Sequence, residues 1–362
     1  MKYITEYRNP DLARRLAERI AAATSRGCNI MEICGGQTHS IMKYNITELL
    51  PAEIRLIHGP GCPVCVTPLE KIDKALALAG QKEVILTSFG DMMRVPGSSG
   101  DLLGAKAAGA DVRIVFSPLD AVTLAMENPS KKVVFFAIGF ETTAPANALA
   151  LLRAAALKLQ NFYMLCSQVL VPPAIRAILS SGNALIDGLL APGHVCTITG
   201  YGEYIDLATE FSIPVVVTGF EPVDILRGIE AVNVMINEGR YQVENRYERA
   251  VTIGGNQLAL NTMYKAFMVC DRQWRGIGNI PMSGLAIRDE YSLFDAEREF
   301  NLENINTTEP EICIAGKVLQ GLATPDSCEA FGTACTPETP LGAPMVSSEG
   351  ACSAYYRYKL LR

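Results

Sequence analysis

Short apolar runs rich in β-branched residues recur along the first two thirds of the chain, and each closes at Gly or Pro. They span residues 29–36, 54–61, 83–90, 112–118, 133–140, 162–167 and 214–220. Stretches with helical periodicity lie between them, at 68–79, 145–159 and 222–237. Continuous apolar strands that alternate with helices are typical of parallel sheets covered on both faces. The pattern therefore predicts an α/β fold.

An internal similarity indicates that the α/β unit occurs twice. The segment "VVFFAIGFETT" at 133–143 resembles "IPVVVTGFEPV" at 213–223, both in its strand and in its Gly-Phe-Glu exit. After about residue 240 the segments become longer and more polar, and they end in a tail rich in Gly, Pro, Thr and Ser. We predict a first α/β domain at 1–130, a second at 131–240, and a C-terminal helical and loop domain at 241–362 that lacks a large core.

Composition excludes some classes of partner. The chain has 362 residues, of which 49% are apolar and 19% charged, and this is a globular composition. A formal net charge of −6 offers no basic surface for nucleic acid. No apolar run reaches the roughly 18 residues that span a bilayer, and the N-terminus reads as an acid-containing amphipathic helix rather than a signal peptide. We predict a cytoplasmic protein with no membrane or nucleic-acid partner.

Eleven cysteines in a reducing compartment indicate metal or thiol chemistry rather than a disulfide framework. In "EICGGQTH" (32–39), Cys34 ends a predicted strand, and two glycines permit a tight turn that leaves the sulfur exposed. His39 follows five positions later. This arrangement suits a metal ligand or a nucleophile, although a half-buried cysteine before an ordinary turn and a capping histidine would have the same pattern.

A second thiol motif lies in "HGPGCPVC" (58–65), where Cys62 and Cys65 form a Cys-x-x-Cys flanked by glycines. This spacing either closes a small disulfide or supplies two ligands to one metal. A closed zinc site needs a second pair nearby, and the nearest candidate is Cys34 alone. The pattern favours a redox-active disulfide beside a metal-binding cysteine.

The tail carries four further thiols, Cys313, Cys328, Cys335 and Cys352. Four thiolates are what a [4Fe–4S] cluster or a structural zinc ion requires. Their spacing is not the paired Cys-x-x-Cys of zinc ribbons, which favours iron–sulfur and leaves zinc as the alternative. The isolated cysteines are interpreted as packing residues: Cys28, Cys166, Cys196 and Cys270.

Glu141 is a candidate for proton transfer. It lies in "GFETT" (139–143), at a strand end that precedes a strong helix-forming segment. We expect a solvent-facing carboxylate there, positioned near the thiol loops because the carboxyl ends of parallel strands gather at one edge. The alternative is a helix entry in which Glu favours the positive end of the dipole.

These motifs together resemble one family. "CGGQTH", "GPGCPVC", "GFETT" and "CEAFGTACTPETPLGAPMVSSEGACSAYY", in this order and over nearly the whole chain, are similar to the HypD hydrogenase maturation factors. The resemblance implies two similar α/β domains and a third domain with a [4Fe–4S] cluster. It also implies a scaffold on which, with a small HypC-type chaperone and cyanide from a HypE-type donor, the Fe(CN)2CO unit of [NiFe]-hydrogenases is assembled.

The resemblance assigns roles to individual residues. Cys34 corresponds to the iron-binding cysteine of the family, and Cys62 and Cys65 to its redox-active pair. The four tail cysteines correspond to the cluster ligands. We therefore expect a redox-active assembly scaffold more than a turnover enzyme. The alternatives are an iron–sulfur-dependent thiol–disulfide oxidoreductase acting on a protein substrate, and a structural zinc protein.

Overall fold

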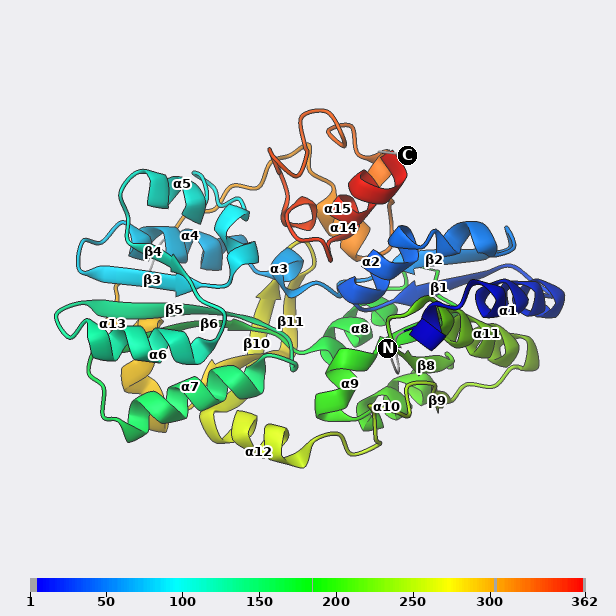
Figure 1. Cartoon of the computed structure of the whole chain (residues 1–362), viewed down its shortest axis with the longest axis horizontal. Helices are drawn as coiled ribbons and strands as arrows, with labels where there is room; N and C mark the ends of the chain where they lie inside the picture. The colour runs from blue at the N-terminus through cyan, green and yellow to red at the C-terminus, as the bar shows by residue number, and fades with distance from the viewer. Residues whose placement is uncertain (1–4, 184, 303–304, 361–362) are drawn as a thin grey trace.

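Two sheets lie side by side, and the cysteine-rich C-terminal segment lies over the junction between them (Figure 1). The structure is a computed structural model that describes residues 5–183, 185–302 and 305–360. The first sheet contains, in spatial order, β2 (Ile54–His58), β1 (Cys28–Glu32), β7 (Gly188–Pro192), β8 (Val215–Thr218) and β9 (Val243–Asn245). The second contains β4 (Val112–Ile114), β3 (Val84–Ser88), β5 (Lys132–Gly139) and β6 (Phe162–Gln168).

Every strand pair in these two sheets is parallel, which confirms the predicted fold class of the α/β part. All seven apolar runs became strands. Two further strands of these sheets were not predicted: β7, whose short run ends in Ala-Pro, and β9, which is half-buried throughout.

The sheets do not follow the predicted domain boundary at residue 130. β1 and β2 pair with β7, β8 and β9, whereas β3 and β4 pair with β5 and β6. The chain therefore leaves the first unit after β2, builds the second sheet, and returns for β7. Local apolar patterns identify strands but do not report which strands pair, so the contiguous ranges 1–130 and 131–240 do not describe the two sheets.

The two sheets share a strand order, but the internal sequence similarity does not mark equivalent strands. β5, which precedes "GFETT", is third along its sheet, and β8, which precedes "GFEPV", is fourth along the other. The two units therefore repeat a strand order rather than a sequence motif.

Helices cover both faces of each sheet (Figure 1). Around the first sheet lie α1 (Pro10–Ala23), α2 (Gly35–Lys43), α9 (Gly193–Thr199), α10 (Gly202–Glu210) and α11 (Pro222–Glu238). Around the second lie α4 (Leu69–Ala79), α5 (Leu102–Ala107), α6 (Pro118–Glu127), α7 (Ala144–Ala156) and α12 (Gln257–Ala266). One apolar core runs continuously from the first sheet through Cys62, Cys65 and Phe140 to the second, so the units share buried surface.

An antiparallel hairpin follows α12 and was not predicted. It consists of β10 (Phe267–Trp274) and β11 (Gly278–Ile287). The N–H of Leu170 donates to the carbonyl of Ser283 over 2.8 Å, so β11 lies beside the end of β6. α8 (Val171–Ser180) starts at this point and leads back to the first sheet.

The C-terminal segment is built from short elements, including α14 (Ala315–Leu319) and α15 (Ala351–Tyr355). Its own buried apolar cluster consists of Ala330, Cys335 and Met345. A unit with so small a core depends on other interactions for its order.

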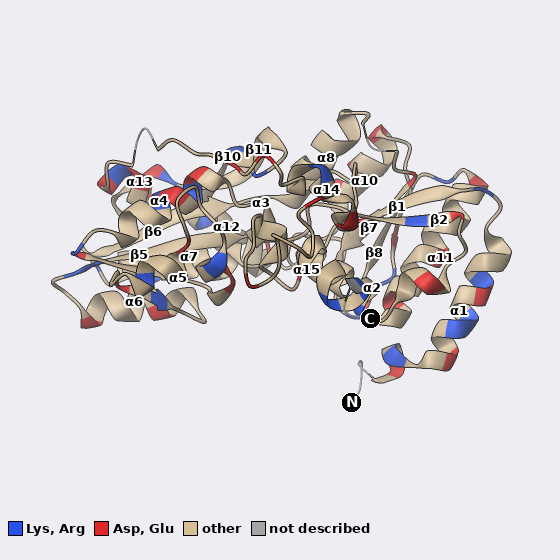
Figure 2. Ribbon diagram, turned by 90° about the horizontal axis from the view of Figure 1, so that it is seen from above, with Lys and Arg blue, Asp and Glu red and all other residues tan. Residues whose placement is uncertain are grey.

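Lys and Arg are interspersed with Asp and Glu along α1 and over the helices of the second unit (Figure 2). Among the residues that the structure describes, no helix is long and apolar enough to cross a bilayer.

Candidate functional site

The thiol loops lie at the carboxyl ends of the strands, where parallel sheets commonly bind ligands. In the first sheet, β1 and β7 are neighbours whose connections diverge, and this is a topological switch point. Cys34 follows β1 and His194 follows β7, and both line a cavity of about 410 Å³. Phe140, Thr142 and Thr143 of the second unit line the same cavity. Both α/β units therefore contribute to the site around Cys34.

Cys34 is the N-cap residue of α2. Its relative exposure is 8%, so the sulfur is more buried than the sequence analysis expected. Burial raises the pKa of the thiol, and the charge of Glu349 raises it further, while the backbone N–H groups of Gly36 and Gln37 oppose the shift. The thiol is therefore protonated at neutral pH.

Cys62 and Cys65 form a disulfide, with a Cα–Cα distance of 5.2 Å. This confirms the predicted proximity of the pair and lies within the usual range for a disulfide. The loop that carries the pair packs against the Cys34 turn: the N–H of Gly35 donates to the carbonyl of Gly61 over 2.8 Å. Gly61 and Pro63 line the Cys34 cavity, which places the two motifs beside one another as predicted.

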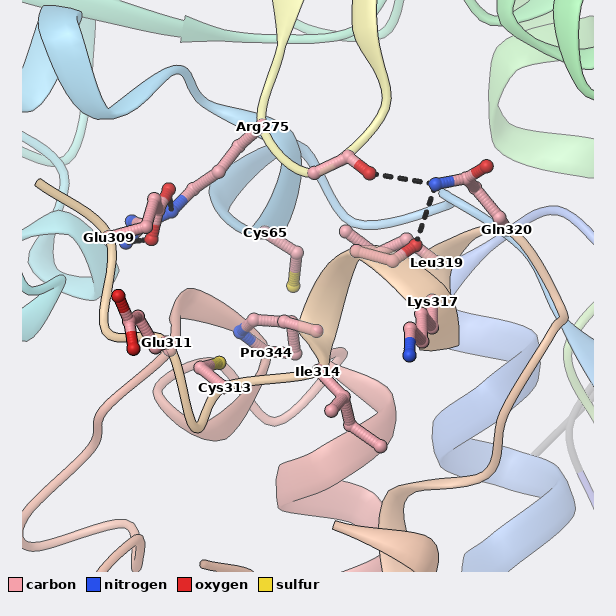
Figure 3. A pocket seen from close by; sticks show the side chains of 14 residues that line it. Cys65, Arg275, Glu309, Glu311, Cys313, Ile314, Lys317, Leu319, Gln320 and Pro344 are labelled. Carbon is pink, nitrogen blue, oxygen red and sulfur yellow. Dashed lines mark hydrogen bonds and ion pairs between the residues drawn. The ribbon is translucent and has the colours of Figure 1, made fainter.

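The opposite side of the disulfide loop faces the C-terminal segment (Figure 3). Cys65 and Cys313 line a second cavity, of about 380 Å³, together with Pro344. At its margin the buried Arg275 makes a bidentate ion pair with Glu309, at 2.7 and 2.8 Å. Cys65 thus connects the Cys34 region with the cysteine-rich segment.

The four tail cysteines, spread along one loop-rich segment of the chain, line one small cavity. It also contains the apolar side chains of Ile314, Phe331 and Met345. Burial raises the pKa of Cys313 and of Cys352, and the neighbouring thiols of the set raise both further. Composition and spacing predicted that these four residues act as one set, and the fold brings them together.

This donor set fits a soft polynuclear metal group by chemistry, because it consists of thiols in apolar surroundings. The four thiols therefore lie around one small common space whose other lining is apolar. Within the described ranges, no three His, Cys, Asp or Glu side chains converge closely enough to hold a single metal ion.

His39 lies on the face of α2 that contacts the C-terminal segment. Its Nδ1 is 3.2 Å from the carbonyl of Ser348, and its ring meets that of Tyr358 edge-on at 5.3 Å. It does not belong to the described lining of the Cys34 cavity. Its contacts are those of a residue that fixes the C-terminal segment to α2.

Glu141 is buried, with 2% exposure, where the sequence analysis expected a solvent-facing carboxylate. Its Oε1 accepts the N–H of Val171 over 2.9 Å, which ties the end of β5 to the start of α8. Burial raises the pKa of Glu141 to about 8. A carboxyl group with such a pKa can exchange a proton near neutral pH.

His194 and Glu349 also line the Cys34 cavity, and neither was predicted from the sequence. His194 stacks on Phe220 with ring centroids 3.7 Å apart, and burial lowers its pKa. "GLLAPGH" (188–194) has a strand-end Gly-His that could have been found had β7 been recognised. The packing interpretation is confirmed for Cys28, Cys166 and Cys196, which are buried, while Cys270 is half-buried.

The fold and the site define a class of thiol-rich α/β protein with a cysteine-bearing C-terminal unit. Residues 11–359 match the HypD family model, described as "Hydrogenase formation hypA family". The chain is 47% identical to the hydrogenase maturation factor HypD of Rhizobium leguminosarum bv. viciae, over 100% of this chain and 97% of that one. It is 45% identical to the HypD of Escherichia coli K12, over 99% and 98% respectively. The chain therefore belongs to the HypD family of hydrogenase maturation factors.

Proposed function

We propose that the chain is the scaffold on which the Fe(CN)2CO unit of [NiFe]-hydrogenases is assembled. Cys34 binds the iron, and a small HypC-type chaperone supplies a further ligand while a HypE-type protein donates cyanide. The observation that carries the proposal is the position of Cys34 at a cavity formed by both α/β units and by Glu349. Cyanide and carbon monoxide favour low-spin ferrous iron, a metal that soft thiolates bind well.

The Cys62–Cys65 disulfide is the redox-active group of this proposal. Its loop packs on the Cys34 turn, so opening of the disulfide would alter the surroundings of the iron ligand. Cys313, Cys328, Cys335 and Cys352 would hold a [4Fe–4S] cluster, which supplies one-electron redox chemistry when bound. Cys65 borders the same cavity as Cys313, which makes the disulfide a neighbour of that cysteine set.

A thiol–disulfide oxidoreductase acting on protein substrates is less well supported. Cys62 and Cys65 are 3% and 0% exposed, so a protein thiol has no direct access to either sulfur. A structural zinc ion would use the same four tail thiols, and the unpaired spacing of these cysteines along the sequence is what favours a cluster over zinc.

Infrared spectroscopy of the chain purified with its small partner tests the proposal. We expect CN and CO stretching bands in the wild-type complex and their loss in Cys34→Ser. Cys270→Ser is the matched control, because Cys270 is half-buried on β10 and lines none of the three cavities within the described residues. Bands of full intensity in Cys34→Ser would exclude Cys34 as the iron ligand.

A further inference from the structure

Glu32, at the end of β1, carries a carboxylate with no exposed surface, two residues before Cys34. Its Oε2 accepts the backbone N–H of Cys34 over 2.9 Å. Its Oε1 accepts a hydrogen bond from His58 Nδ1 over 2.7 Å and another from the Thr38 hydroxyl. Three donors therefore hold this side chain, and one of them is the backbone of the candidate iron ligand.

A fully buried carboxyl group at the end of a strand is energetically unfavourable. Removing a carboxylate from water is strongly unfavourable unless partners compensate, and an apolar side chain would fill the same space without this penalty. Glu32 also joins the two thiol loops through its backbone, because its carbonyl accepts the N–H of Gly59 over 2.8 Å. The residue thus connects the Cys34 turn to the loop that leads to Cys62.

His58 extends this connection to the C-terminal segment. It is 7% exposed, and its ring meets that of Tyr355 edge-on, with centroids 5.4 Å apart. Tyr355 belongs to α15, three positions after Cys352. The contacts therefore run without a gap from the cysteine-rich segment through Tyr355, His58 and Glu32 to the backbone of Cys34.

We propose that Glu32 is a positioning residue for Cys34, and that the Glu32–His58–Tyr355 contacts make the position of Cys34 depend on the packing of the cysteine-rich segment. The inference deepens the proposed function, since it rests on Cys34 being the reactive thiol. While α15 is docked, Tyr355 holds His58, and His58 holds the carboxylate toward the Cys34 N–H. When α15 shifts, His58 is free to turn, and the Cys34 turn loses this constraint.

Alkylation of Cys34 by iodoacetamide, quantified on its peptide by mass spectrometry, tests the link without iron or a partner. We expect Tyr355→Leu to accelerate labelling roughly five- to tenfold, the ratio that corresponds to one lost hydrogen bond. Tyr355→Phe keeps the ring against His58 and is expected to retain the wild-type rate. Neither substitution changes a charge, so the comparison isolates packing.

The same pair of Tyr355 substitutions in a Glu32→Gln background completes a double-mutant cycle. We expect Tyr355→Leu to have little further effect there, because the carboxylate that responds to His58 is gone. Acceleration of equal size in both backgrounds would overturn the link through Glu32. Equal rates for Tyr355→Leu and wild type would overturn it as well.

Two controls separate this inference from a folding defect and from the proposed function. If Glu32→Gln fails to fold, His58→Phe takes its place in the cycle, because this substitution removes the donor to Glu32 Oε1 and adds no charge. Equal acceleration by Tyr355→Leu in both backgrounds, or no acceleration at all, would again overturn the link. If the wild-type complex shows no CN or CO bands but the labelling rates differ as expected, this inference stands and the proposed function is rejected. If the wild-type complex shows the bands but the labelling rates do not differ as expected, the inference alone is rejected.

Discussion

Gly61 lies against the backbone of Cys34, so closely that a Cβ at position 61 would be 2.4 Å from both the N and the Cα of Cys34. No side chain fits at this distance, so the loop that carries the disulfide can approach the Cys34 turn because residue 61 is glycine. The two thiol motifs, 28 positions apart between Cys34 and Cys62, thus share one packed contact.

Gly61→Ala should separate the two loops. We expect destabilisation by about 1–3 kcal/mol, typical of overpacking in a well-packed site, and loss of hydrogenase maturation. Gly202→Ala is the control, because a Cβ there meets nothing within 4 Å. Urea unfolding and hydrogenase activity in a strain without its own copy of the protein measure both effects. Wild-type stability in Gly61→Ala would show that the loops separate without cost.

Replacement of Cys328 or Cys335 by Ala should abolish cluster binding. We expect loss of the visible absorbance near 400 nm that iron–sulfur clusters show, and faster proteolysis of the C-terminal segment, because metal binding contributes folding free energy where the core is small. Cys166→Ala is the control, since this buried cysteine lies in β6, away from the cavity of the four thiols. Full cluster content in both variants would contradict the assignment.

The stability of the chain should fall as the pH rises through the range in which Glu141 keeps its proton. Burial raises the pKa of Glu141 from 4.5 to about 8. Between these values the unfolded chain releases this proton while the folded chain retains it, so stability decreases with pH and levels off above about 8. Glu141→Gln cannot ionise and should remove this component. Unfolding midpoints of both proteins at pH 5, 7 and 9 measure the difference, and parallel curves would contradict it.

Glu141→Gln should also impair maturation while the fold remains intact, if the carboxyl group transfers a proton. The amide retains an oxygen that can accept the N–H of Val171, so the contact between β5 and α8 survives. Hydrogenase activity in the complemented strain is the measurement. Unchanged activity would leave Glu141 with the role of fixing the start of α8.

Reduction of the Cys62–Cys65 disulfide should depend on the fold. Because both sulfurs are almost fully buried, we expect dithiothreitol to reduce the native pair much more slowly than the pair in urea-unfolded protein. Cys62→Ser and Cys65→Ser should each abolish maturation and leave the iron–sulfur absorbance unchanged. Normal maturation in either variant would exclude redox cycling of the pair.

The sequence by itself determined the elements and the chemical character of the site. Apolar runs marked seven strands correctly, and cysteine spacing indicated both the pair at 62 and 65 and the set of four in the tail. These signals are local: strand patterns arise over a few residues, and soft-metal chemistry follows from residue type. Glu141 and Cys34 became candidate site residues for the same reason, since both follow apolar runs at strand ends.

The tertiary structure alone decided which strands pair, and with that the surroundings of each residue. β1 and β2 are separated in sequence from β7 by the whole second sheet, so no local pattern could place His194 beside Cys34. The burial of Glu141, and the convergence of His58 and Tyr355 on Glu32, likewise depend on segments distant in sequence. Pairing and burial are set by which apolar faces cover one another across the folded chain, and a single segment does not carry that information.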